Sequence, residues 1–468
     1  MNESVLFAPF ADKMRQAGLD LASIQAFRSN FAKLVAGDTG LMPESSIDPV
    51  LALPTYSELD KPSSKLLPAL YNQTCVLKLN GGLGTSMGLE KAKSLLEIKG
   101  GETFLSLSCK QIQRARKSHP ECTSIQFMLM NSFSTSSDTL LAMQGLESDF
   151  IELMQNKSPK VSADGKFTPA VCLADEELEW CPPGHGDLFA ALLGSGILDR
   201  LVDVEKCRYL FVSNSDNLGA TLDPTLLHYF TSSGKALLME VAERTEADKK
   251  GGHLALVKGT QGFTLRESAM CPPADLPYFQ NITTHKFFNT NNIWLDLVQV
   301  RQVMRKHGGI MPLPLIRNCK TVDPRNPKSQ PVYQLETAMG AAIEAFGQAG
   351  GAVVVPRSRF APVKTCSDLF ALRSDAYGLT EDFQIVLLAK TNPIVVLDDA
   401  YFKLVDGMEA RVKVYPSLLE CEKLVVNGPA VFDQPNVKFS GKVTITIQGK
   451  DSKSVPSQSM VNGTELVI

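Results

Sequence analysis

Apolar residues near the N-terminus recur at steps of three and four positions, the spacing of an amphipathic helix. They are Met14, Leu19, Leu21, Ile24, Phe27, Phe31 and Leu34. The spacing predicts a helical segment over residues 1–45, which could bind a partner but is better explained by packing against the rest of the chain. The stretch from Met42 to Pro68 is punctuated by proline and serine and predicts a connector.

Between residues 74 and 375, short apolar runs alternate with helical segments. The predicted strands are Thr74–Leu79, Ile125–Met130, Tyr209–Val212, Ala236–Val241 and Ala352–Val355. The predicted helices are Phe104–His119, Leu188–Ile197 and Gln334–Phe346. This alternation is typical of an α/β domain with a mainly parallel sheet. Such sheets bind ligands at the carboxyl ends of their strands, so we expect the chemistry in the loops after Leu79, Met130 and Val212.

Helical spacing disappears after about Lys390, where two stretches alternate strictly between apolar and polar positions. Residues 424–432 and 437–445 align with each other, with a glycine, Gly428 or Gly441, at the matching place. This repeat predicts stacked short strands, as in a β-helix, although an antiparallel meander has the same alternation. The chain is therefore expected to divide into a helical segment (1–45), an α/β domain (46–385) and an all-β domain (386–468).

The composition is that of an ordinary globular protein, with 44% hydrophobic and 21% charged residues among 468. The chain has 47 basic and 50 acidic residues, a formal net charge of −3 and no basic tract, so nothing indicates nucleic-acid binding. The 10 cysteines form no C-x-x-C pair and are expected to be reduced core residues. We find no signal peptide and no stretch of about 18 apolar residues, so we expect a cytoplasmic protein without membrane spans.

Three glycines directly follow the first predicted strand, in Asn80-Gly81-Gly82-Leu83-Gly84-Thr85. Glycines let the backbone pass close to a ligand and turn its N–H groups toward phosphate oxygens. The loop does not fit the dinucleotide pattern G-x-G-x-x-G, because Gly88 comes one residue late, and it lacks the Gly-Lys-Ser/Thr of a P-loop. Lys93 follows and can reach back to phosphates held by the loop, although a turn followed by a surface lysine is the alternative.

The segment Lys78–Lys93 resembles the signature loop of the eukaryotic UTP–glucose-1-phosphate uridylyltransferases, also called UDP-glucose pyrophosphorylases. Four further segments resemble motifs of the same family, in the same order: Cys181–Asp187, Ser213–Asn217, Phe288–Trp294 and Arg357–Thr365. The resemblance implies a Rossmann-like nucleotidyltransferase domain with a mainly parallel mixed sheet. It also implies that the helical N-terminal segment precedes this domain and that a C-terminal left-handed parallel β-helix follows it.

The resemblance assigns roles to residues in each motif. Nucleotide binding falls to Leu79, Asn80, Gly81, Gly82, Met130, Gln155, Gly184, Ser213 and Asn214. Binding of the sugar and its phosphate falls to His185, Gly252, Glu267, Asn291 and Asn292. The catalytic residues are Lys93, Lys364 and Asp216, and Asp216 also binds the Mg²⁺ cofactor. These residue types suit their roles, because an amide can pair with the edge of uracil and amides and carboxylates can bind a polyol.

The implied reaction is attack by an oxygen of glucose-1-phosphate on the α-phosphorus of UTP, which gives UDP-glucose and pyrophosphate reversibly. The nucleophile is already an anion, so catalysis rests on alignment and charge compensation. We expect Lys93 at the β- and γ-phosphates and Lys364 at the α-phosphate and the sugar phosphate. A carboxylate such as Asp216, just after the strand Tyr209–Val212, suits Mg²⁺, although it could instead cap the strand in an Asx-turn.

Two positions depart from related enzymes. Ser86 stands where bacterial sugar nucleotidyltransferases carry an arginine in the loop, and Ala92 stands where most of the family has a proline before the lysine. Without that arginine, more of the charge compensation should fall to the metal ion and to Lys93.

Two other functions remain open. A broad-specificity UDP-sugar pyrophosphorylase would share these motifs, whereas the N-acetylglucosamine enzymes usually carry the arginine that Ser86 replaces. Non-enzymatic assembly subunits combine similar domains, but an inactive copy would be expected to lose Lys93, Asp216 or Lys364. The C-terminus lacks the extra strand expected in the family's assemblies, so we expect a monomer.

Overall fold

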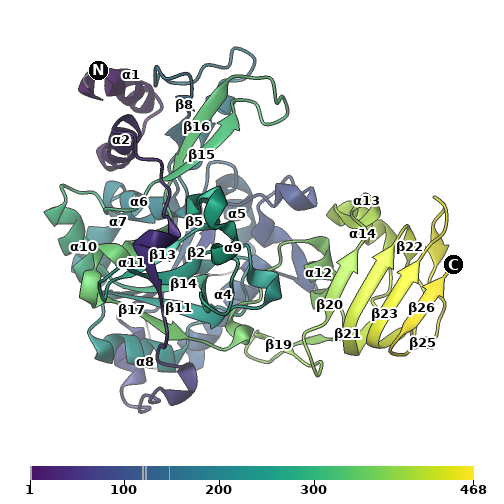
Figure 1. Cartoon of the computed structure of the whole chain (residues 1–468). Coiled ribbons are helices and arrows are strands. Elements are labelled where there is room, and N and C mark those ends of the chain that lie inside the picture. Colours follow the sequence, from purple (N-terminus) through teal and green to yellow (C-terminus); the bar gives the residue numbers. More distant parts are fainter. Residues whose placement is uncertain (1–2, 119–120, 122–123, 147) are drawn as a thin grey trace.

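A ten-stranded mixed sheet forms the centre of the computed structural model, which describes residues 3–118, 121, 124–146 and 148–468 (Figure 1). Four neighbouring strands, the last of which forms an edge of the sheet, lie in the order β10 (Tyr209–Asn214), β2 (Thr74–Asn80), β5 (Gln126–Asn131) and β6 (Ile151–Met154), all parallel. The predicted strands around residues 74, 125 and 209 are thereby confirmed. The parallel direction places the carboxyl ends of all four strands at one edge of the sheet.

The other half of the sheet is built on antiparallel pairing. The long strand β14 (Phe287–Asp296) lies between β10 and β11 (Leu237–Glu243) and is antiparallel to both. Beyond β11, β17 (Gly350–Val354) is parallel again, as predicted for the last two strands of the α/β region. The remaining strands are β1 (Ile47–Pro49), β12 (His253–Val257) and β13 (Phe263–Arg266). The predicted connector therefore contributes an edge strand, β1, which pairs with β12.

Buried apolar side chains on both faces explain why β2 lies near the centre of the sheet. Cys75 and Leu77 pack into one hydrophobic core, whereas Val76 points to the opposite face and packs into another. On that second face, β2 is covered by helix α4 (Phe104–Ser118), through buried residues such as Leu105 and Ile112. Helix α4 agrees with the predicted helix to Ser118, and the predicted last residue, His119, lies outside the described residues.

The N-terminal segment consists of two helices, α1 (Glu3–Gln16) and α2 (Leu21–Val35), as the spacing predicts. Asp20 caps α2 by accepting a hydrogen bond from the backbone N–H of Ser23 (2.8 Å). Aromatic and apolar side chains of both helices share a core with Val161, Leu315 and Leu335 of the α/β domain. The helices therefore pack against the main domain, the favoured of the two explanations given by the sequence.

Two predicted helices differ from the structure. The first three residues of the predicted helix Gln334–Phe346 belong to strand β16 (Pro331–Glu336), which pairs with β15 (Ile316–Thr321). Within the predicted helix, only Ala342–Ala345 are α-helical (α11). Short apolar runs fit both the helical and the strand period, so they do not distinguish a helix from a strand. Here, pairing with β15 makes the segment a strand. The predicted helix Leu188–Ile197 is interrupted: α6 (Leu188–Gly194) ends before Gly196, which has a positive φ of 74°, and α7 (Ile197–Asp199) follows.

The C-terminal strands pair in parallel, which excludes the antiparallel meander. They are β20 (Ile394–Leu397), β21 (Ser417–Asn427), β23 (Lys438–Thr446), β25 (Ser459–Met460) and β26 (Thr464–Val467). The alignment of the two repeats is wrong in register. Leu424 lies beside Val443 rather than Val437, and Gly428 contacts Ile447 rather than stacking on Gly441. The alternation of apolar and polar residues is compatible with several pairing registers of the two strands. The lengths of the turns between the strands therefore decide the register.

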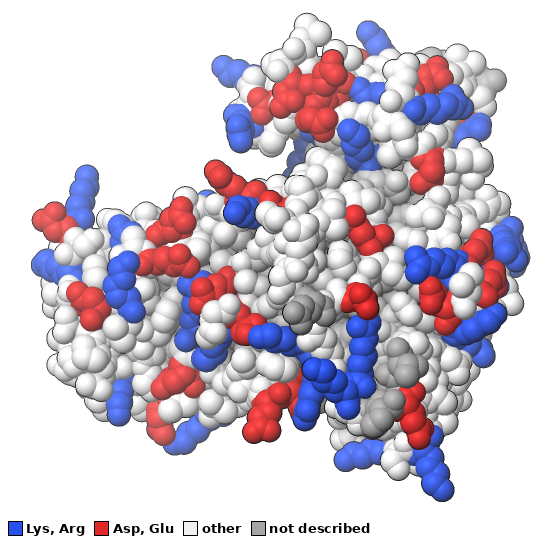
Figure 2. All heavy atoms as spheres, turned by 180° about the vertical axis from the view of Figure 1, so that it is seen from behind, with Lys and Arg blue, Asp and Glu red and all other residues white. Residues whose placement is uncertain are grey.

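The C-terminal strands share one hydrophobic core with the segment that follows the glycine loop. Met87, Leu96 and Ile98 pack in the same cluster as Leu424 and Phe432. Positive and negative side chains are interspersed over the face shown in Figure 2, as expected from the nearly balanced charge. Within the described ranges, no helix is both long and apolar enough to cross a membrane.

Candidate active site

A cavity of about 240 Å³ lies at the carboxyl ends of the parallel strands. It is lined by Leu79, Gly81, Gly82, Lys93, Met130, Gln155, His185, Asn214, Ser215 and Asp216. All of these except Ser215 are among the residues that the sequence assigns to nucleotide, phosphate or metal binding. Ser215 lies between two predicted residues, and only its position in the loop could have indicated it.

The glycine loop follows β2 and forms one side of this cavity. Gly84 and Gly88 have positive φ angles of 65° and 76°, so the chain makes two left-handed turns that favour glycine. A Cβ atom on Gly81 would lie 2.7 Å from Oε1 of Gln155, so a side chain there would make the end of Gln155 shift. The backbone N–H of Lys93 donates to the carbonyl of Gly82 (3.0 Å), which brings the lysine back to the loop.

Lys93 and Asp216 meet across the cavity. The Nζ atom of Lys93 lies 2.6 Å from Oδ2 of Asp216, and both side chains are partly buried. Asp216 comes from the loop after β10, so this ion pair connects the loops that follow the adjacent strands β2 and β10. The pair presents one cation and one carboxylate to any phosphate or metal ion that enters.

His185 is held as a neutral hydrogen-bond donor. Its Nδ1 atom accepts a hydrogen bond from the backbone N–H of Met339 (3.0 Å), so the ring proton of the neutral tautomer is on Nε2. Burial lowers the pKa of His185 to about 4, which keeps the ring uncharged near neutral pH. An Nε2–H group facing this cavity can donate to a phosphate oxygen without adding a charge.

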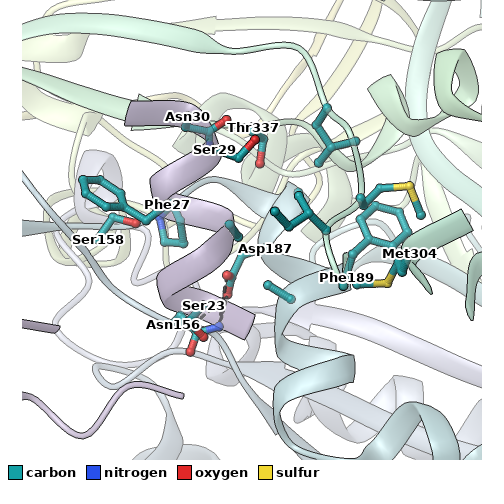
Figure 3. A pocket seen from close by; sticks show the side chains of 18 of the residues that line it. Ser23, Phe27, Ser29, Asn30, Asn156, Ser158, Asp187, Phe189, Met304 and Thr337 are labelled. Carbon is teal, nitrogen blue, oxygen red and sulfur yellow. Dashed lines mark hydrogen bonds between the residues drawn. The ribbon is translucent and has the colours of Figure 1, made fainter. Parts of the chain in front are cut away.

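The loops that carry Gln155 and Gly184 are fastened together. The side-chain amide of Gln155 donates to the carbonyl of Gly184 (3.2 Å). Next to it, Asp187 accepts hydrogen bonds from the backbone N–H (2.7 Å) and the side chain (3.0 Å) of Asn156. Figure 3 shows this contact beside helix α2. Burial raises the pKa of Asp187 to about 6. The sequence motif contains Asp187, but its partner Asn156 was not predicted.

Two predicted nucleotide-binding residues have their side chains engaged within the protein. The amide of Asn80 donates to Asn131 (2.7 Å) and Thr139 (2.9 Å), and both partners are buried. The hydroxyl of Ser213 accepts from the buried ammonium of Lys78 (2.8 Å). Neither residue lines the cavity, although both are next to residues that do.

The predicted sugar-binding residues lie on β14 and on the loops around β12 and β13. Gly252 and Glu267 are neighbours, since a Cβ atom on Gly252 would lie 2.4 Å from the Glu267 carboxylate. Burial raises the pKa of Glu267, while a hydrogen bond from Asn289 and the charge of Lys364 oppose this rise. The exposed Lys364 does not line the cavity, and its ammonium lies 6.0 Å from the centroid of the Phe360 ring. Asn289, which was not predicted, also donates to Asn291 (2.8 Å).

Asn291 and Asn292 differ in their surroundings. Asn291 is a non-glycine residue with a φ of 60°, and its side chain is partly buried. Asn292 is fully buried, and its amide donates to Glu240 (3.1 Å) and to the carbonyl of Arg359 (3.2 Å). The side chain of Asn292 is thus directed into the domain rather than into the cavity.

Asp216 fits a magnesium ion that is bound mainly by phosphates. Within the described ranges, no three His, Cys, Asp or Glu side chains come close enough to form a metal site of their own. Mg²⁺ commonly takes one or two carboxylates and completes its coordination with substrate phosphates and water. A single accessible carboxylate beside a phosphate-binding loop suits that mode.

Comparisons with known proteins identify the family of the chain. The sequence profile of the UTP–glucose-1-phosphate uridylyltransferase family matches residues 24–439. The chain belongs to this family. The UTP–glucose-1-phosphate uridylyltransferase of Saccharomyces cerevisiae is 38% identical over 396 residues, which cover 83% of this chain and 77% of the yeast protein.

Solved structures of UTP–glucose-1-phosphate uridylyltransferases, the UDP-glucose pyrophosphorylases, share the fold over nearly the whole chain. A point mutant of the Leishmania major enzyme, in complex with UDP-glucose, superimposes with a TM-score of 0.92 at 44% identity and covers 99% of both chains. A Trypanosoma brucei relative, described as a UDP-glucose phosphorylase, gives a TM-score of 0.88 at 45% identity, again over 99% of both chains.

Proposed function

We propose that the chain transfers the uridylyl group of UTP to glucose-1-phosphate, with UTP bound in the cavity at the ends of the parallel strands. The observation that carries this proposal is that Lys93, Asp216 and His185 line one cavity together with the glycine loop. The family is named for this reaction, and an L. major relative was solved with UDP-glucose bound. The enzyme is thus a nucleotidyltransferase.

In the proposed reaction, an oxygen of the sugar phosphate attacks the α-phosphorus of UTP. A new P–O bond forms there, the bond to the β-phosphate oxygen breaks, and pyrophosphate leaves with the electron pair. The loop Leu79–Gly82 holds the nucleotide, and the ammonium of Lys93 compensates the charge that develops on pyrophosphate. His185 donates its Nε2–H to the sugar phosphate. Lys93 leaves Asp216 when the substrates bind. The groups are then positioned so that little reorganisation is needed during the reaction.

Lys364 approaches from the sugar side of the site. The influence of its charge on the pKa of Glu267 supports a position for its ammonium near the proposed glucose-binding residues. There it can compensate the charge on the sugar phosphate and on the α-phosphate, where two polyanions meet. One unit charge pair at 4 Å contributes about 4 kcal/mol at an effective dielectric constant of 20, so one lysine on each phosphate group is of the right order.

Mg²⁺ is the proposed cofactor, held by Asp216 and phosphate oxygens. When bound, it supplies positive charge that lets the two anionic substrates approach each other. Glucose specificity is proposed to rest on Gly252, Glu267 and Asn291. The buried Asn292 can support them only indirectly, because its side chain is engaged within the domain. Asn289 supports this set, because it donates to Asn291 and to Glu267.

A pyrophosphate-release assay tests the activity and its specificity. UTP and Mg²⁺ are mixed with the protein and with glucose-1-phosphate, galactose-1-phosphate or N-acetylglucosamine-1-phosphate in separate reactions. We expect strong release only with glucose-1-phosphate, and its loss when Mg²⁺ is chelated. Equal rates with all three sugars would favour the broad-specificity enzyme, and no release with any would overturn the proposal.

Three further properties belong to the same proposal. The parallel strands after residue 386 are proposed to wind as a left-handed β-helix, and the protein is proposed to be cytoplasmic and monomeric. Sedimentation tests the last point. A single species near 51.0 kDa is expected, and one at several times this mass would overturn it.

A further inference from the structure

The buried carboxylate of Glu240, in the central sheet, accepts hydrogen bonds from side chains of two other segments, β14 and Arg357–Thr365. Glu240, on β11, is fully buried. Arg359 donates from Nε to Oε2 and from Nη2 to Oε1, both at 2.7 Å. The indole of Trp294 (2.9 Å) and the amide of Asn292 (3.1 Å) donate to the same two oxygens. Both oxygens thus have two donors, and the planar guanidinium is held in one orientation.

The backbone of Arg359 continues this network toward the metal loop. Its carbonyl accepts hydrogen bonds from the amides of Asn217 (3.0 Å) and Asn292 (3.2 Å). Asn217 also accepts from the backbone N–H of Ala361 (3.1 Å) and forms an isolated β-bridge with Pro362. This bridge joins the loop after β10 to the segment Arg357–Thr365.

These contacts join the two segments that carry the proposed catalytic charges. Asn217 directly follows Asp216, and Lys364 lies just after Pro362 in the other segment. Lys364 itself is exposed, so the position of its ammonium depends on how its backbone is held. Glu240, Arg359 and Asn217 are 0%, 6% and 1% exposed, so they can act on a substrate only through the residues that they hold.

We propose that Glu240, Arg359 and Asn217 are positioning residues that hold the Asp216 loop and the Lys364 segment at one fixed separation. This inference rests on the proposed function, in which Asp216 and Lys364 act on the same phosphates. A residue that only stabilised the fold would lower the amount of active protein. A positioning residue lowers kcat of folded protein, because the reacting groups are no longer aligned.

The first test replaces the guanidinium group of Arg359, which donates two hydrogen bonds to Glu240, by the single ammonium group of lysine. Arg359→Lys keeps the charge but cannot bind both oxygens of Glu240. We expect kcat to fall by about tenfold to a hundredfold, with KM for UTP changed less than about twofold, because the glycine loop is not part of this network. The matched control is R208K, in the ion pair of Arg208 with Asp296 (2.9 Å) at the opposite end of β10 and β14. It should leave both constants unchanged. Unchanged kcat in R359K would overturn the proposal.

The second test uses Asn217→Ala, which removes no charge and remains informative if R359K does not fold. The variants N217A, K364A and N217A/K364A are compared by kcat, after thermal melting has shown that each is folded. If Asn217 acts largely by placing Lys364, its loss costs about tenfold or more in the wild-type background and much less once Lys364 is absent. Equal losses in both backgrounds would overturn the proposal. Full activity in K364A alone would instead overturn the role of Lys364 in the proposed function.

Discussion

The ammonium of Lys93 lies 2.6 Å from the carboxylate of Asp216, so the two charges that we assign to phosphate and to Mg²⁺ neutralise each other in the free protein. In the proposed reaction, binding of UTP with Mg²⁺ separates them, because the lysine is assigned to the phosphates and the carboxylate to the metal. The pair holds both side chains at the cavity before the substrate arrives.

Removing Asp216 should therefore have opposite effects on the two forms of the nucleotide. In D216A, Lys93 is released, and binding of metal-free UTP should tighten by up to about fivefold, since a partly exposed ion pair contributes up to about 1 kcal/mol. The enhancement of binding by Mg²⁺ should disappear. Calorimetric titration with UTP, in EDTA and in Mg²⁺, measures both effects. Mg²⁺-dependent binding that persists in D216A would show that the metal is held elsewhere.

Lys93 should matter more for the reaction than for the fold. In K93A, the charge on the leaving pyrophosphate is no longer compensated, and we expect kcat to fall on the order of 10²- to 10³-fold. The melting temperature should change little, because the ion pair is partly exposed. K91A, at an exposed lysine two positions earlier, is the control and should keep its rate. A K93A variant with near-normal kcat would contradict the assigned role.

His185 should act as a neutral donor across the working pH range. Burial lowers its pKa to about 4, so its protonation state does not change between pH 5.5 and 8. We expect H185F to weaken binding of glucose-1-phosphate by about tenfold and to leave the shape of the kcat/KM profile over this range unchanged. If kcat/KM of the wild type changes with pH near pH 6.5 and this change is absent in H185F, the imidazole of His185 is instead exposed and titrates in this range.

Asp187 gives a pH dependence of stability with a definite sign. Its pKa is raised from 3.8 to about 6 in the folded state by burial, so the folded protein binds the proton more tightly than the unfolded chain. The contribution of this group to the free energy of unfolding therefore falls as pH rises from about 4 to about 6, by at most about 3 kcal/mol. Urea unfolding of wild type and D187N at pH 4.5 and pH 7 measures it. From pH 4.5 to pH 7, the free energy of unfolding of the wild type should fall relative to that of D187N. An equal difference at the two pH values would contradict a raised pKa of Asp187 in the folded state.

The close packing of Gly81 provides a test of the nucleotide loop. A Cβ atom there would lie 2.7 Å from Oε1 of Gln155, which must then move. We expect G81A to raise KM for UTP by about tenfold, because a misplaced amide no longer pairs with the base. G145A is the control, since its Cβ would meet nothing closer than 3.8 Å. If G81A binds UTP normally, Gln155 has no part in holding the nucleotide.

The sequence predicts the place of the cavity because its loops follow strands with a clear apolar pattern, whereas individual residues such as Gln155 and His185 come from the family resemblance. The loops after β2 and β10 each carry short polar motifs directly after a buried strand, so Lys93 and Asp216 could be placed at one edge of the sheet. By contrast, β14 was not predicted as a strand, because Asn289, Thr290 and Asn292 interrupt its apolar pattern with polar side chains that are buried.

The network around Glu240 could not be predicted for a related reason. Glu240 lies among apolar residues of β11, and its ion-pair partner Arg359 is 119 residues away in the sequence. Local spacing carries no signal for such a contact, and only the folded sheet brings the two together. The same holds for Asn156, whose partner Asp187 lies in a different loop.

A crystal structure with UTP and Mg²⁺, in the absence of glucose-1-phosphate, tests the central claim most directly. UTP cannot be consumed without the sugar phosphate, so the complex should persist. We expect the Lys93–Asp216 pair to be broken, with Nζ of Lys93 bound to the β- or γ-phosphate and Asp216 bound to the metal ion. UTP bound in the cavity while Lys93 and Asp216 remain paired at about 2.6 Å would contradict the account.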